Sequence, residues 1–127
     1  MAKDFDQWNE EKKHLHKQNR FVYAYPREIW LCALGVNIGA ETDGKNENFE
    51  RPILIMRVYN KDTLLVLPIT TKTKNDEFHY AIQAKLGTVW IKLTQARVIS
   101  HRRLVRKLDT LSLKEFQKVK RLFQKYT

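Results

Sequence analysis

Residues 53–69 read Ile53-Leu54-Ile55-Met56-Arg57-Val58-Tyr59-Asn60-Lys61-Asp62-Thr63-Leu64-Leu65-Val66-Leu67-Pro68-Ile69. Two apolar runs flank the polar triplet Asn60-Lys61-Asp62, a pattern that is typical of a β-hairpin. Arg51-Pro52 precedes the first run, and proline is tolerated at the beginning of a strand. We therefore predict two strands, over residues 53–59 and 63–69, as part of a β-rich domain.

The sequence on either side of this hairpin predicts further strands. We expect strands over residues 28–34, 77–84 and 88–93, with Lys85-Leu86-Gly87 as the turn between the last two. Residues 97–100 are either a strand or a short connector. No helix alternates with these strands, which excludes a Rossmann or P-loop fold. The elements fit a compact antiparallel barrel, and the predicted fold class is mainly β with terminal helices.

Both ends of the chain are predicted to be helical. Residues 3–20 form a mostly polar helix with a thin apolar stripe, which must dock on the domain, on a second subunit or on another protein. We assign residues 1–20 to an N-terminal helical extension and residues 21–127 to the folded domain. Near the other end, Ser112-Leu113-Lys114-Glu115 matches a capping box. The apolar residues that follow share one helix face: Leu113, Phe116, Val119, Phe123 and Tyr126.

Composition limits the class of protein. The 127 residues suffice for one domain with one core, and the formal net charge of +10 favours a polyanionic partner such as RNA or DNA. The alternative is that the charge serves only solubility. Residues 84–108 carry seven Lys or Arg and no acid. No apolar run is long enough to span a membrane and no signal-peptide core is present, so we expect a cytoplasmic protein. The single cysteine, Cys32, lies in an apolar strand and is expected to be a buried, reduced thiol.

Known catalytic motifs that need a metal or a cofactor are not found in the sequence. His14 and His16 are two residues apart, so on a helix they point to different sides, and His79 and His101 have no Cys pair nearby. Acids are scarce outside residues 36–50 and the N-terminal helix, which disfavours a two-metal nuclease. We therefore expect neither a metal ion nor a cofactor.

The candidate chemistry rests on an arginine, a hydroxyl and a carboxylate. Arg51 follows a polar loop that holds three of the four glycines and Glu41, and its guanidinium suits phosphate oxygens. Thr70 ends an apolar strand, which predicts a hydroxyl at a fixed point on the sheet rim. Each residue has a structural alternative. Arg51 could pair with Glu50 or Glu41, Thr70 could bond a turn amide, and Glu41 could only hold the loop.

Several motifs, in order, resemble the MazF/PemK toxins from about residue 26 to the C-terminus. The motifs are Glu28-Ile29-Trp30, Asn37-Ile38-Gly39-Ala40-Glu41, Arg51-Pro52-Ile53-Leu54-Ile55, Leu67-Pro68-Ile69-Thr70-Thr71-Lys72, Leu93-Thr94-Gln95-Ala96-Arg97-Val98-Ile99 and Arg103-Leu104. The resemblance implies an SH3-like barrel closed by a C-terminal helix. It also implies a toxin that cleaves single-stranded RNA such as mRNA, without metal and with sequence selectivity. The loop between Glu41 and Arg51 is longer than in compact members of the family.

The resemblance also assigns roles to residues and partners. It places the essential arginine at Arg51, the essential hydroxyl at Thr70 and the loop glutamate, as general base or its orienting group, at Glu41. It implies a homodimer and a cognate antitoxin whose peptide covers the RNA groove. Alternatives of the same fold are a non-enzymatic toxin that poisons a protein target and a barrel that binds RNA without cutting it.

Four further residues are candidates for RNA binding. Thr71, Lys72 and Lys74 follow Thr70 and could contact phosphates, or form an ordinary solvated turn. Arg97 resembles a position that the family uses near the subunit interface, and it is either structural or RNA-facing. Trp30 and Trp90 could stack on bases, but both lie in apolar strands, so core packing is favoured.

Overall fold

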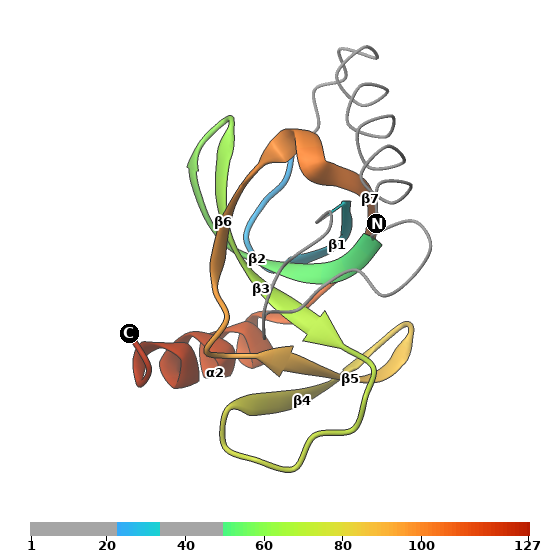
Figure 1. Ribbon diagram of the computed structural model, residues 1–127, viewed down its shortest axis with the longest axis vertical. Helices are drawn as coiled ribbons and strands as arrows, with labels where there is room; N and C mark the ends of the chain where they lie inside the picture. The colour runs from blue at the N-terminus through green and yellow to red at the C-terminus, as the bar shows by residue number, and fades with distance from the viewer. Residues whose placement is uncertain (1–22, 34–49) are drawn as a thin grey trace, which may run out of the picture.

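The computed structural model describes residues 23–33 and 50–127, and the predicted N-terminal helix and Glu41 lie outside these ranges (Figure 1). The described elements, in chain order, are β1 (Glu28–Ala33), β2 (Glu50–Asn60), β3 (Thr63–Thr70), β4 (His79–Ala84), β5 (Gly87–Lys92), β6 (Arg97–Ser100), the 3-10 helix η1 (His101–Arg103), β7 (Leu104–Thr110) and α2 (Leu113–Gln124). The predicted hairpin is confirmed as β2 and β3. No helix of the described residues is long and apolar enough to cross a membrane.

The strands form one antiparallel sheet in the order β4-β5-β3-β2-β1-β7, and β6 also pairs with β3. Figure 1 shows β1, β2, β6 and β7 curled around a common interior, while β4 and β5 extend beyond it. Strand pairing within the described residues ends at β4 and β7. The mainly β antiparallel fold with a C-terminal helix is therefore confirmed, whereas the strand pairs of the described residues do not show the predicted closure of the barrel.

Two hydrophobic clusters lie on opposite faces of the central strands. The inner cluster fills the interior of the curl and comprises Trp30, Cys32, Ile53, Ile55, Leu64, Val66, Ile99 and Leu104. The helix-side cluster lies on the other face, and α2 contributes Phe116 and Val119 to it. Because alternate residues of a strand point to opposite faces, burial on both faces explains why β1, β2 and β3 are nearly continuous apolar runs. The predicted burial of Cys32 and Trp30 is confirmed.

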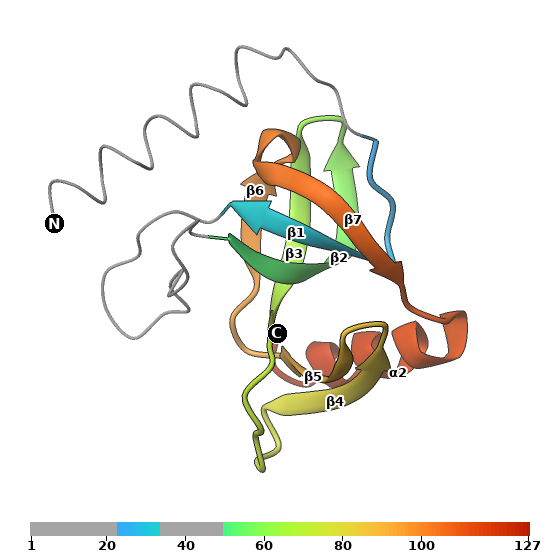
Figure 2. The same cartoon turned by 90° about the vertical axis from the view of Figure 1, so that its right-hand side faces the viewer.

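The C-terminal helix covers the helix-side cluster beside β4 and β5 (Figure 2). Ser112 is its N-cap, and the Ser112 hydroxyl accepts a hydrogen bond from the Glu115 N–H at 3.2 Å. The predicted apolar face is correct for Phe116 and Val119 but wrong for Leu113, which is 54% exposed. Leu111, just before the cap, is buried with Phe116 in a staple-like arrangement and fills that end of the core instead.

Strand β7 was not among the predicted elements. It pairs with β1 at the edge of the sheet, with two register shifts, and it carries Arg106 and Lys107 on its exposed positions. Edge strands often carry charged side chains, which prevent the addition of a further strand. These charges interrupt the apolar alternation by which a strand is recognised in the sequence. Strand β4 begins at His79, two residues later than predicted, because the Asp76 carboxylate accepts the Phe78 N–H in a turn.

Candidate functional site

Arg51 and Thr70 lie on one face of two neighbouring strands. The last recorded pair between β2 and β3 is Ile53 with Pro68, and each candidate residue lies two positions beyond that pair on its own strand. Residues two apart on a strand point to the same face. Arg51 is opposite Cys32 on β1, and Thr70 is opposite Trp90 on β5. We call the sheet face that carries Cys32, Arg51, Thr70 and Trp90 the site face.

Thr70 is more buried than the sequence predicts. Only 7% of the residue is exposed, and its Oγ1 accepts a hydrogen bond from the Lys72 N–H at 3.1 Å. This is the turn-amide contact that we considered as the structural alternative. The contact occupies one lone pair of the hydroxyl and leaves its proton available for donation. The bond therefore fixes the position of the hydroxyl without excluding a contact with substrate.

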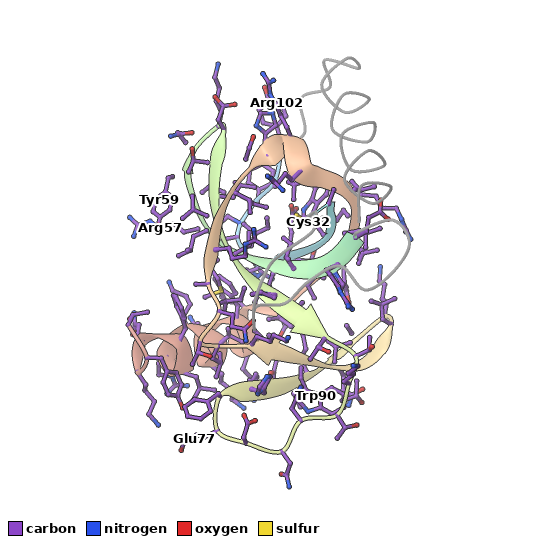
Figure 3. The ribbon with its side chains drawn as sticks, viewed as in Figure 1. Cys32, Arg57, Tyr59, Glu77, Trp90 and Arg102 are labelled. Atoms are coloured by element: carbon purple, nitrogen blue, oxygen red, sulfur yellow. The ribbon has the colours of Figure 1, made fainter. Side chains whose placement is uncertain are left out.

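Cys32, beside Arg51, is not a candidate nucleophile. Burial raises the pKa of its thiol to about 12, although the nearby Arg103 and Arg97 guanidinium groups oppose that shift. The thiol is therefore protonated at neutral pH and unreactive. Figure 3 shows Cys32 inside the curl of β1, β2, β6 and β7. Arg103 Nη1 donates a hydrogen bond to the Ala33 carbonyl at 3.3 Å, and this bond holds the Arg103 guanidinium beside β1.

Arg97 lies on β6, where its cross-strand partner is Val66 of β3. Thr70 lies on β3 as well, four residues beyond Val66. Four residues of strand correspond to about 13 Å, so the backbone of Arg97 lies well away from Thr70. The Arg97 guanidinium nevertheless lies close enough to Cys32 to oppose the rise in its pKa. Its Nη1 is buried, and no hydrogen-bond partner for it lies within residues 23–33 and 50–127. Arg97 and the buried Ile99 alternate with the exposed Val98, so the guanidinium turns toward the inner cluster.

The other RNA-binding candidates after Thr70 lie on the connection from β3 to β4. Thr71 and Lys72 are exposed, whereas Lys74 is partly buried. Chain continuity keeps this connection at the end of the site face. The structure thus brings Arg51, Thr70 and these three residues to one end of the sheet. Arg97 lies on the site face as well, with its guanidinium close to Cys32.

Asp76 and His79 form a pair that sequence reasoning missed. His79 Nδ1 lies 2.6 Å from Asp76 Oδ1, and the hydrogen bond with His79 lowers the pKa of the Asp76 carboxyl. His79 is opposite Lys92 on β5, so it belongs to the same face as Trp90. The sequence indicates His79 only as a possible metal ligand, although Asp76, three residues before this strand-initial histidine, also indicates a hydrogen-bonded pair. The described residues contain no group of three His, Cys, Asp or Glu side chains arranged to hold a metal ion.

Glu28 is a buried acid with a structural environment. Its Oε1 accepts hydrogen bonds from Trp30 Nε1 and from the Tyr25 N–H, each at 2.9 Å, and Lys107 Nζ lies 3.1 Å from its Oε2. Burial opposes the charged carboxylate, but these contacts outweigh it and lower the pKa of Glu28. The groups that contact Glu28 belong to β1, to the residues just before it and to β7, so Glu28 holds the edge strands together and does not face a substrate.

Solved structures share this fold. A crystal structure of MazF from Deinococcus radiodurans is 19% identical, with a TM-score of 0.65 over 84% of this chain and 96% of that chain. An endoribonuclease in complex with its cognate antitoxin, from a Mycobacterial species, is 12% identical, with a TM-score of 0.65 over 82% and 94%. The Mycobacterium tuberculosis toxin MazF-mt6 is 15% identical, with a TM-score of 0.61 over 79% and 95%.

At these identities the likeness concerns the fold. Among curated proteins, none matches this chain in sequence. The family of PemK-like, MazF-like toxins of type II toxin-antitoxin systems matches residues 25–127, from just before β1 to the C-terminus. The chain therefore belongs to the PemK/MazF-like toxin family.

Proposed function

We propose that this protein is a metal-independent, sequence-selective endoribonuclease that cleaves single-stranded RNA as the toxin of a toxin–antitoxin pair. One observation carries the proposal. Arg51 and Thr70, which are far apart in sequence, share the site face at equivalent positions beyond the Ile53–Pro68 pair. A guanidinium and a hydroxyl placed together in this way suit one phosphate group. The similar solved structures include proteins described as endoribonucleases.

The reaction follows from the chemistry of RNA. The ribose 2′-OH attacks the adjacent phosphorus, the bond to the 5′-oxygen breaks, and the products are a 2′,3′-cyclic phosphate and a 5′-hydroxyl. Arg51 stabilises the charge that develops on the phosphoryl oxygens, and the Thr70 hydroxyl donates a hydrogen bond to one of them. A base must accept the 2′ proton, and an acid must protonate the leaving oxygen. Glu41 is our candidate for the base.

The remaining proposed contacts are with the RNA strand and with the antitoxin that competes for the same groove. Thr71, Lys72 and Lys74 bind the phosphates on either side of the cut, which fixes the register of the strand. Arg97, the fourth candidate for RNA binding, contacts the RNA through the part of its side chain that is not buried. The active form is a homodimer in the cytoplasm, and a cognate antitoxin peptide occupies the RNA groove. The antitoxin complexes among the similar structures support that last assignment.

Cleavage in the presence of a chelator tests the function directly. End-labelled single-stranded RNA should be cut fully in excess EDTA, because neither Arg51 nor Thr70 needs a metal ion to act. Denaturing gels would report the fragments, and phosphorylation of the downstream fragment by a polynucleotide kinase would report its free 5′-hydroxyl. A gel shift without cleavage would instead support the RNA-binding barrel, and no effect on RNA would support a toxin with a protein target.

Substitution of Thr70 separates its catalytic role from its structural one. Thr70→Val keeps the β-branched shape and removes only the hydroxyl, so the cleavage rate should fall on the order of a hundredfold. The melting temperature should change little, since one partly solvated turn contact is lost. Thr63→Val, at the other end of β3, is the matched control and should cut normally. A less stable Thr70→Val protein with normal specific activity would assign Thr70 to the turn alone.

A further inference from the structure

The β4–β5 hairpin has one buried face and one open face. Val89 and Ile91 of β5 pack into the helix-side cluster, and so does Ile82 of β4. The alternate residues of the two strands, which include Ala81 and Trp90, point to the opposite face, and none of them is fully buried. The hairpin turns through Lys85 and Leu86 into Gly87, whose φ of +109° favours glycine. The open face of this hairpin continues the site face.

Trp90 is the aromatic residue of this open face. It is partly buried, in contrast to Trp30, which is 7% exposed in the inner cluster. Core packing, which the sequence favoured for both tryptophans, is thus confirmed for Trp30 and wrong for Trp90. The difference follows from the sheet, because Trp30 faces the curled interior whereas Trp90 lies beyond it (Figure 3).

The cross-strand neighbours of Trp90 in the described strands have small side chains. On one side, its cross-strand partner is Ala81 of β4, an exposed residue whose methyl group covers little of an indole. On the other side its partner is Thr70, one strand spacing or about 4.8 Å away. No side chain of the described residues accepts a hydrogen bond from the indole N–H or stacks on the ring.

The charge around Trp90 suits a polyanion. Lys92 lies two residues along β5 on the same face, and Lys72 and Lys74 lie on the connection after Thr70. The acids of that connection are Asp76, whose carboxylate is bonded to His79 and to the Phe78 N–H, and the exposed Glu77. An aromatic ring beside lysines is the arrangement that binds single-stranded nucleic acid, since bases stack on the ring while lysines follow the phosphates.

We propose that Trp90 is a stacking platform for one RNA base, that of a nucleotide next to the scissile phosphate held by Arg51 and Thr70. The inference rests on the proposed function, since it takes the position of the phosphate from it. Stacking on Trp90 fixes the nucleotide beside Thr70 and so aligns the phosphate for attack. It also makes the protein responsive to the identity of that base, because bases differ in stacking strength.

A double-mutant cycle between protein and RNA tests the platform. The probe is a labelled RNA that the wild-type protein cuts, with a 2′-deoxy sugar at the cut to prevent cleavage. If the protein cuts no RNA, the unmodified RNA is used as the probe. Trp90→Leu should weaken its binding about tenfold or more, whereas Trp90→Phe should retain most of it. Leu86→Ala, which removes another exposed apolar side chain from the same hairpin, is the matched control.

An abasic nucleotide is then placed at each position of the probe in turn, beginning next to the cut where the RNA is cut. At one position next to the cut, the abasic RNA should bind wild-type protein as weakly as intact RNA binds Trp90→Leu, and the two changes together should add little. Additive losses at every position, or equal binding by wild type and Trp90→Leu, would overturn the platform. Melting temperatures identify any variant that is merely unfolded. If Trp90→Leu does not fold, Trp90→Phe provides the test by fluorescence. RNA should quench the tryptophan fluorescence of the wild type and should quench that of Trp90→Phe much less. Cleavage of the unmodified RNA reports separately on the proposed function.

Discussion

An RNA with a single 2′-deoxy sugar on the 5′ side of the scissile phosphate should bind this protein normally and remain uncut. Binding should persist because phosphate contacts dominate the affinity of proteins for nucleic acid, and a 2′-deoxy sugar leaves every phosphate in place. Cleavage should be lost completely because the proposed nucleophile is the missing hydroxyl. Anisotropy measures the binding, and a denaturing gel measures the cleavage.

The control for this substrate is an RNA with the same deoxy sugar moved several nucleotides from the cut, which should be cut at the normal rate. Cleavage of the test substrate would rule out attack by the 2′-OH. Loss of activity in EDTA that magnesium restores would rule out the metal-independent mechanism. Either result would return Arg51 and Thr70 to a binding role.

Replacement of Arg51 by alanine should reduce RNA cleavage at least a hundredfold. A guanidinium aimed at the developing phosphoryl charge contributes several kcal/mol, or about two to three orders of magnitude in rate. Arg51→Lys should recover only part of the activity, because an ammonium group lacks the planar fork that contacts two oxygens. Most of the RNA affinity should remain, since the other cations still contact phosphates.

Arg57→Ala is the matched control for Arg51, because Arg57 lies on the same strand but is exposed. Its guanidinium lies 5.7 Å from the ring centroid of Tyr59, and Figure 3 shows both side chains at the outer edge, well away from Trp90. This variant should cut RNA at the wild-type rate. If Arg51→Ala retains more than about a tenth of the wild-type rate while folded, Arg51 has no part in the chemistry. Circular dichroism and thermal melting of both variants establish folding.

Local patterns in the sequence were sufficient for much of the fold. The hairpin of β2 and β3 follows from two apolar runs around Asn60-Lys61-Asp62, and the beginning of α2 follows from the Ser112 cap. These features depend on neighbours within a few residues, which the sequence displays directly. Strand β7 was missed because its pairing with β1 joins segments more than seventy residues apart and its charges hide the alternation.

The candidate site divides in the same way. The sequence by itself determined which residue types are available: Arg51 at the beginning of a strand, Thr70 at the end of another, and lysines after it. Only the tertiary structure decided that Arg51 and Thr70 share a face, that Trp90 lies beside Thr70 outside both hydrophobic clusters, and that the Arg97 guanidinium turns inward near Cys32. The physical reason is register. A strand's sequence fixes the alternation of its side chains, but long-range pairing with its neighbours fixes which face is covered and which residues meet across it.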